Sequence, residues 1–319
     1  MNDATAVPQP RVSFSTIALI EHPVESVIEL AAGWGFDGID LCVSPRGHIA
    51  SDACDRTVAD LRRRADAYGL RIAGLYGYGG RRLIGAECAG DEALIRAEIR
   101  CAALLGATSV RVFAGHEGEA AENAAGFAAA LRPLCAEAQG RGIRIVLPNH
   151  NDLAGTASRA AVLFRLLGHG SAGLIFNGPT LELAHHDPLA EMELAWPLID
   201  RIELKDFRRD AAGRPIPVAL GEGEASLRPL LARLAARNFG GWITIHYLRN
   251  LYPDAEDARE ALLRSLAWIR QALAGPPDNA CRPASSALGS EAENNLNDAS
   301  SQLWTNSSRT VRPPSTRID

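Results

Sequence analysis

Short, almost continuous apolar runs alternate along this chain with longer segments in which apolar residues recur at helical spacing. Between positions 227 and 234, four leucines show the i, i+3, i+4, i+7 pattern of a helix with one buried face. Continuous apolar runs of strand length are typical of parallel strands that are buried on both faces. The expected strands are Val12–Ile17, Gly38–Val43, Arg71–Tyr76, Ser109–Ala114, Arg144–Leu147, Gly173–Phe176, Arg201–Leu204 and Trp242–Tyr247.

Segments of helical periodicity fill the intervals between these strands, and several of them end at a glycine, as left-handed C-terminal caps do. Eight strands alternating with eight helices over about 260 residues have the size and rhythm of a (β/α)8 TIM barrel. A doubly wound open α/β sheet is the second choice, because the first strand-to-helix turn lacks the GxGxxG motif of a dinucleotide site. The weakest helix falls around Pro188–Pro197, and the others are expected at Glu25–Trp34, Cys54–Tyr68, Glu92–Leu105, Ala120–Arg141, Ser158–Leu167, Leu227–Arg237 and Ala255–Leu273.

Composition divides the chain into three parts. We expect a flexible leader over residues 1–10, a single barrel domain over 11–275 and a disordered tail over 276–319. The tail is rich in Ser, Asn, Pro and Ala, and Trp304 is its only aromatic residue. Such a segment buries too little apolar surface to offset the entropy of ordering it.

Charge and cysteine content exclude several classes of partner. The formal net charge is -5 with both signs interspersed, which argues against a nucleic-acid partner. No apolar run approaches the length of a membrane span, and the N-terminus lacks the pattern of a signal peptide. The six cysteines are scattered without a CxxC pair, which favours free thiols in a reducing cytosol. We therefore expect a cytoplasmic protein with no nucleic-acid or membrane partner; a homo-oligomer is left open.

Polar side chains collect where the expected strands end, which is where TIM barrels carry their chemistry. An imidazole, a carboxylate and an amine from neighbouring strands would meet at one barrel mouth and form a candidate site. The candidate residues are Tyr76, His116, His150, Asn177, Glu203, Lys205, Arg209 and His246.

Glu203 and Lys205 lie two positions apart, so they share one face of their strand. Lys205 is the only lysine in the chain, and the other 32 of the 33 basic residues are arginine. The two cations are not interchangeable where a compact charge or a titratable amine is needed. Two interpretations stay open. Glu203 and Lys205 form a local ion pair that keeps the amine protonated, or the ammonium has chemistry of its own.

His246 is the candidate general base, because an imidazole titrates near neutral pH, and Glu203 or Lys205 is the partner acid. Glu203 and His246, joined by Asn177 or His150, also offer a sparse ligand set for one divalent cation such as Mn, Mg, Co or Zn. We expect such a metal to be weakly bound or absent.

Five segments together resemble the xylose-isomerase-like TIM barrels, which include sugar and sugar-phosphate isomerases and epimerases. The resemblance covers roughly residues 11–274. The segment 202–206, Ile-Glu-Leu-Lys-Asp, stands where the family has its His-x-Lys-Asp motif. The other matching segments are 35–41, 110–113, 220–224 and 241–247.

The resemblance implies a divalent metal held by Glu, Asp, His and Glu at the ends of strands five to eight, with the two glutamates moving a proton between sugar carbons. In this chain those four positions are Pro148, Asn177, Glu203 and His246, so all four differ from the usual pattern. Arg209 resembles a substrate-anchoring arginine of the epimerases. The resemblance therefore supports the fold and leaves the activity to be argued from the changed residues.

Three functions compete. The first is a sugar or sugar-phosphate isomerase or epimerase with an altered active site, acting by proton transfer on a small hydroxy-carbonyl compound, with His150, Asn177, Tyr76, His116 and Arg209 around the substrate. The second is a non-catalytic sugar-binding or accessory barrel that has lost its metal site. The third is a lyase that uses Lys205 as a Schiff-base nucleophile. A DNA-repair endonuclease of the same superfamily ranks last, because such sites need several metals and a basic face.

Overall fold

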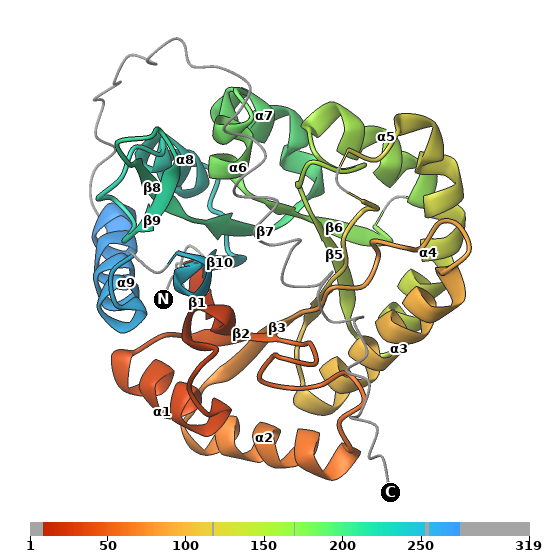
Figure 1. The fold of residues 1–319 in the computed structure, drawn as a ribbon, viewed down its shortest axis with the longest axis horizontal. Coiled ribbons are helices and arrows are strands. Elements are labelled where there is room, and N and C mark those ends of the chain that lie inside the picture. Colours follow the sequence, from red (N-terminus) through yellow and green to blue (C-terminus); the bar gives the residue numbers. More distant parts are fainter. Residues whose placement is uncertain (1–8, 117, 169, 253–254, 275–319) are drawn as a thin grey trace, which may run out of the picture.

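The computed structural model describes residues 9–116, 118–168, 170–252 and 255–274. Eight parallel strands close into a barrel in the order β1, β2, β3, β4, β5, β6, β7 and β10, with β10 pairing back onto β1 (Figure 1). The predicted TIM barrel is therefore confirmed, and the open-sheet alternative is wrong. The barrel strands are β1 (Arg11–Ser15), β2 (Gly38–Cys42), β3 (Arg71–Tyr76), β4 (Ser109–Arg111), β5 (Arg144–Pro148), β6 (Ala172–Phe176), β7 (Ile199–Leu204) and β10 (Trp242–Ile245).

Helices surround this barrel on its outside (Figure 1). Their apolar faces pack on the strands; in α8, for example, all four leucines of the predicted stripe are buried. Gly35 and Gly106 adopt positive φ directly after α1 and α3, as the predicted left-handed caps require. The helices are α1 (Val24–Trp34), α2 (Asp55–Ala67), α3 (Cys88–Leu105), α4 (Ala124–Gly140), α5 (Ala157–Leu167), α6 (Gly178–Leu183), α7 (Pro188–Ala195), α8 (Leu227–Ala236) and α9 (Ala258–Ala274).

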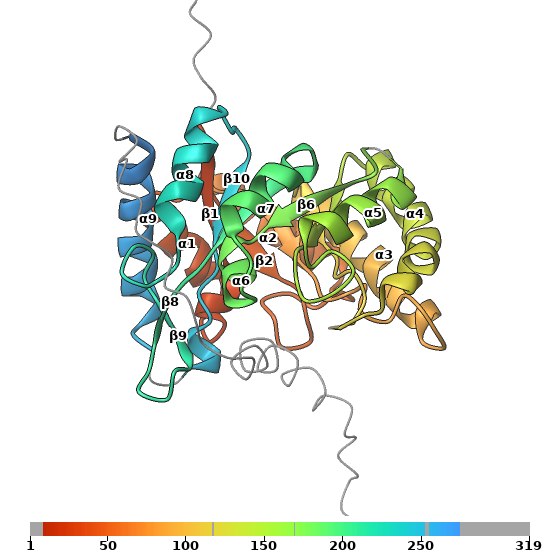
Figure 2. The same ribbon diagram turned by 90° about the horizontal axis from the view of Figure 1, so that it is seen from above.

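The segment after β7 departs from the expected pattern. An antiparallel hairpin of β8 (Asp206–Arg209) and β9 (Pro215–Val218) projects from one end of the barrel before α8 begins (Figure 2). The buried carboxylate of Asp206 holds the returning chain by accepting backbone N–H bonds from Gly221, Gly223 and Ala225 at 2.9–3.1 Å. The sixth helical region is likewise split into α6 and α7, where a single helix near Pro188–Pro197 was expected.

A polar network fills one layer of the barrel interior. Arg201 points inward from β7 and forms an ion pair with Asp40 of β2, with 2.7 Å between Nη2 and Oδ1. The hydroxyls of Ser13, Ser109 and Thr244 complete the network, and every member is at most 3% exposed. Because both charges are paired and hydrogen-bonded, this layer is part of the barrel's packing.

The two ends of the chain lie largely outside the residues that the structure describes. The leader is described only at residues 9 and 10, and the expected tail 276–319 lies outside the described residues. Within the described part of the chain, none of the helices is both long enough and apolar enough to span a membrane. The five cysteines in that part are free thiols, as the scattered pattern predicted.

Candidate active site

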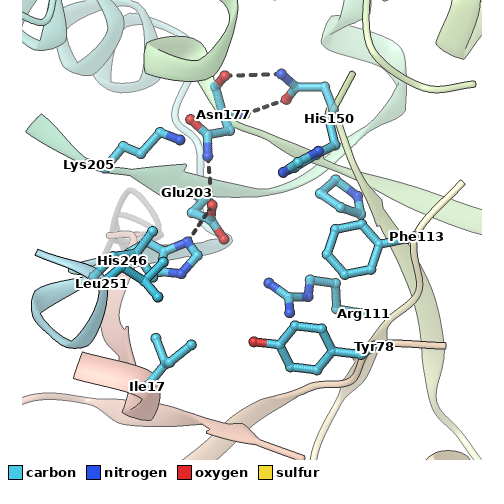
Figure 3. A pocket seen from close by; sticks show the side chains of 13 residues that line it. Ile17, Tyr78, Arg111, Phe113, His150, Asn177, Glu203, Lys205, His246 and Leu251 are labelled. Carbon is cyan, nitrogen blue, oxygen red and sulfur yellow. Dashed lines mark hydrogen bonds and ion pairs between the residues drawn. The ribbon is translucent and has the colours of Figure 1, made fainter. Parts of the chain in front are cut away.

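A cavity opens at the carboxyl ends of the barrel strands (Figure 3). The empty space in it is about 630 Å³, and this figure includes the open mouth of the cavity. Apolar side chains border it on the side of β1 and β10, and charged side chains enter from β4 and β7. The lining residues are Ile17, Tyr78, Arg111, Phe113, Pro148, Asn149, His150, Asn177, Glu203, Lys205, His246, Leu248 and Leu251.

Glu203 and His246 form the centre of this cavity. Adjacent strands bring them together: β7 and β10 pair in register, and the His246 backbone N–H donates to the carbonyl of Leu204 at 2.8 Å. Nδ1 of His246 then lies 2.8 Å from Oε1 of Glu203. Burial favours the neutral form of Glu203, but His246, Arg111 and Lys205 outweigh it and hold the pKa of this carboxyl well below its usual range.

An ionised Glu203 fixes the orientation of the imidazole. A carboxylate only accepts hydrogen bonds, so the proton of a neutral ring is stabilised on Nδ1, which lies 2.8 Å from Oε1 and has no other described partner. In a neutral ring Nε2 is then the unprotonated nitrogen, and no described residue hydrogen-bonds to it. The pair therefore presents a base at Nε2, and its carboxylate stabilises the imidazolium that forms when Nε2 takes a proton.

Asparagines brace the carboxylate from β5 and β6. Nδ2 of Asn177 donates to Oε1 of Glu203 at 2.6 Å, while its Oδ1 accepts the backbone N–H of Thr180 and caps α6. Asn149 exchanges two hydrogen bonds with the backbone of Asn177. Among the described residues, Oε2 of Glu203 has no hydrogen-bond partner, and it is buried from solvent.

Lys205 also lines the cavity, so the prediction that it shares a face with Glu203 is confirmed. The expected ion pair between them is wrong, because Glu203 pairs with His246 and no described carboxylate lies within 4.0 Å of the lysine nitrogen. Burial lowers the pKa of Lys205, and nearby Glu203 only partly offsets that effect. Lys205 and His246 also border a second, smaller hollow beside the β8–β9 hairpin.

Arg111 is a site residue that the sequence reasoning missed. Its side chain is 5% exposed and points into the cavity from β4 (Figure 3). The guanidinium lies 4.4–5.0 Å from the ring centres of Tyr76, Tyr78 and Phe113, and two of its N–H groups donate to the carbonyl of Gly77. The sequence does offer one signal for this residue, because Arg111 is the single charged residue in the otherwise apolar run 110–113.

His150 reaches the cavity, as predicted, and its ring packs edge-on against Phe113. Burial and the cations Arg81, Lys205 and Arg111 lower its pKa to about 3. At neutral pH His150 is therefore an uncharged imidazole that can hydrogen-bond a ligand.

Three predicted substrate residues do not line the cavity. Tyr76 is 1% exposed and lies beneath the site, with its ring centre 6.1 Å from that of His246. His116 is exposed on the loop after β4. Arg209 belongs to the β8–β9 hairpin, where it donates to the carbonyl of Gly213 and lies near Glu224. Direct contact of these three residues with a substrate remains a prediction, because none of them lines this cavity.

The residues at the mapped metal positions do not fit a resident divalent cation. Pro148 has no donor atom, the side-chain oxygen of Asn177 caps a helix, and Glu203 and His246 contact each other directly. No group of three or more His, Cys, Asp or Glu residues in the described part of the chain could hold a metal. The expected Glu203–His246 metal site therefore lacks the ligands that a firmly bound ion needs.

Comparison with known proteins bears mainly on the fold. The family model described as "Xylose isomerase-like TIM barrel" matches residues 28–272. A probable 3-DHS dehydratase from Bacillus anthracis is 16% identical with a TM-score of 0.68, covering 82% of this chain and 99% of that one. A D-psicose 3-epimerase solved with D-fructose is 16% identical with a TM-score of 0.66, covering 83% and 100%.

A further structure of the same fold, a xylose isomerase-like TIM barrel protein from Mycobacterium smegmatis in complex with magnesium, is 16% identical with a TM-score of 0.66, covering 86% of this chain and 98% of that one. A search of curated proteins finds no match. At these identities the neighbours establish the architecture, and the chemistry has to be argued from the residues of this chain.

Proposed function

Because the chain belongs to the xylose isomerase-like TIM barrel family, we propose that it is an isomerase or epimerase that moves a proton next to the carbonyl group of a small, sugar-like hydroxylated substrate. The observation that carries this proposal is the Glu203–His246 pair at the mouth of the barrel. Its carboxylate is ionised and its imidazole is held in one orientation, which together make a general base. Sugar-processing neighbours of the same fold support the class of substrate.

In this mechanism Nε2 of His246 takes the proton from the carbon next to the carbonyl. The C–H bond breaks, its electron pair forms the enolate, and Glu203 stabilises the imidazolium. The ammonium of Lys205 hydrogen-bonds the developing enolate oxygen, which is charge stabilisation by a positioned donor. In an isomerisation the proton returns to the former carbonyl carbon, while the hydroxyl of the first carbon passes its proton to the enolate oxygen and becomes the new carbonyl. In an epimerisation solvent water protonates the first carbon on its opposite face, and His246 releases its proton to solvent.

A Schiff-base reaction of Lys205 is the second candidate, because one observation favours it. Burial lowers the pKa of the amine, and no described carboxylate pairs with it, so more of the nucleophilic form is present than in an exposed lysine. A non-catalytic, ligand-binding barrel is the outcome if neither chemistry is found.

Deuterium incorporation tests the proposal. The full chain is incubated in D₂O with a panel of ketoses, aldoses and their phosphates, and NMR follows exchange at the carbon next to the carbonyl. We expect exchange by the wild type that drops at least about 100-fold in His246→Gln, the usual scale of general-base catalysis. An equal thermal unfolding midpoint for the variant shows that it is folded. Exchange that survives in His246→Gln refutes the assignment, and no exchange with any compound favours the binding barrel.

A further inference from the structure

Two arginines are buried inside this barrel, and their charges are balanced in different ways. Arg201 is 1% exposed, and its charge is balanced by Asp40 at 2.7 Å, with two hydroxyls accepting further hydrogen bonds; its Nε is buried without a described partner. A buried cation is costly unless it is paired and hydrogen-bonded, and Arg201 satisfies both conditions within the protein. It therefore needs no ligand.

Arg111 is buried to nearly the same degree, but it lacks a carboxylate partner. No carboxylate in the described part of the chain lies within 4.0 Å of its guanidinium. Its guanidinium donates to the carbonyl of Gly77 and contacts the Tyr78 hydroxyl, and three aromatic rings lie 4.4–5.0 Å from it. These contacts fix the side chain, and the ionised Glu203 acts on its charge only from beyond ion-pair distance. Glu98 lies nearby, but burial raises its pKa to about 8, so it is mostly uncharged at neutral pH.

The cavity as a whole carries an excess of positive charge. Arg111 and Lys205 enter it from different strands, and Glu203 is its only carboxylate among the described lining residues. That carboxylate is already engaged by His246 and Asn177. A site with two cations and one occupied carboxylate is complementary to a ligand that brings a negative charge of its own.

We propose that the substrate carries an oxyanion, either a carboxylate or a phosphate group, and that Arg111 binds it while His246 acts on the carbon beside the carbonyl. The planar guanidinium suits such a group, because its N–H donors match two oxygens at once. Arg111 is then the residue that selects charged over neutral sugars. The role of His246 in this inference rests on the proposed function. Anion binding by Arg111 does not, because it requires no turnover.

The test compares small probes that differ only in charge. Glycolate, its neutral amide glycolamide and inorganic phosphate are titrated calorimetrically into the full chain at constant ionic strength. We expect saturable binding of glycolate or phosphate, and binding of glycolamide that is at least about 10-fold weaker, or ~1.4 kcal/mol. Arg111→Gln should lose at least the same factor for the anions. Arg132→Gln, which removes an exposed arginine on α4, is the matched control and should bind as the wild type does.

Three results would overturn the proposal: equal affinity for glycolate and glycolamide, unchanged anion affinity in Arg111→Gln, or no saturable binding of either anion. The comparison of glycolate with glycolamide uses the wild type alone, so it remains a valid test even if Arg111→Gln fails to fold. His246→Gln separates the two proposals, because it should lower deuterium exchange at least about 100-fold and retain glycolate binding. Which anion binds more tightly distinguishes a carboxylate from a phosphate substrate.

Discussion

Glu98 provides a stability prediction that can be worked through from the structure. Its carboxyl group is 0% exposed on α3 and packs directly beneath Gly77, in the loop that also supplies the hydrogen-bond acceptor for Arg111. One oxygen accepts the backbone N–H of Tyr78 at 3.1 Å, and the other has no hydrogen-bond partner among the described residues. Burial therefore dominates and raises the pKa of Glu98 from 4.5 to about 8.

A raised carboxyl pKa costs stability as the pH rises. Between pH 4.5 and about 8 the unfolded chain loses this proton and the folded chain keeps it, so the free energy of unfolding falls across this window and is level above it. A gap of about 3.5 pH units corresponds to about 5 kcal/mol as an upper limit. Glu98→Gln removes the titration and nearly preserves the shape of the side chain.

Urea unfolding of the wild type and Glu98→Gln at about pH 5 and about pH 9 measures this effect. We expect similar stabilities at the lower pH and a variant that is several kcal/mol more stable than the wild type at the higher pH. Glu21→Gln, which removes an exposed carboxylate, should follow the wild type at both. Parallel profiles for the wild type and Glu98→Gln would refute the reasoning, because they would mean that the buried carboxyl group ionises normally.

Three further predictions concern the barrel interior and the site. Asp40→Asn should lower the free energy of unfolding by about 3–5 kcal/mol at neutral pH in urea denaturation, because it leaves Arg201 buried without its counter-charge; a loss below about 1 kcal/mol would contradict this. Borohydride added with sugars and sugar phosphates should leave no adduct on Lys205 by mass spectrometry, whereas a mass increase on its peptide would make this a Schiff-base enzyme. Dialysis against EDTA should leave the deuterium exchange rate unchanged and remove any divalent metal, and metal that stays at one ion per chain would show that a ligand set has been overlooked.

The barrel was predictable because each strand is a nearly continuous apolar run and each helix shows its buried face in the sequence. The hairpin after β7 was not predicted, because the carboxylate that organises it, Asp206, bonds backbone groups 15 to 19 residues further along the chain. Nothing in local periodicity reports such a contact.

The site was predicted only in part, because contacts between strands also cannot be read from local periodicity. Strand alternation correctly places Glu203 and Lys205 on one face, but it cannot say which neighbour each of them contacts. The register between β7 and β10 decides that Glu203 meets His246. Arg111 was overlooked because its role depends on the rings of Tyr76 and Tyr78, which come from another segment of the chain, and on having no carboxylate within 4.0 Å among the described residues. Neither feature can be read from the run 110–113.

The tautomer of His246 tests the central claim most directly, and it can be measured before the substrate is known. Nitrogen-15 NMR at about pH 9, well above the ordinary imidazole pKa of about 6.5, distinguishes the two ring nitrogens, and comparison with His246→Gln assigns the signal. We predict that Nδ1 carries the proton and that Nε2 is unprotonated, because Nδ1 lies 2.8 Å from the ionised Glu203. A proton on Nε2 would contradict the account, since the nitrogen facing the cavity could then not act as the base.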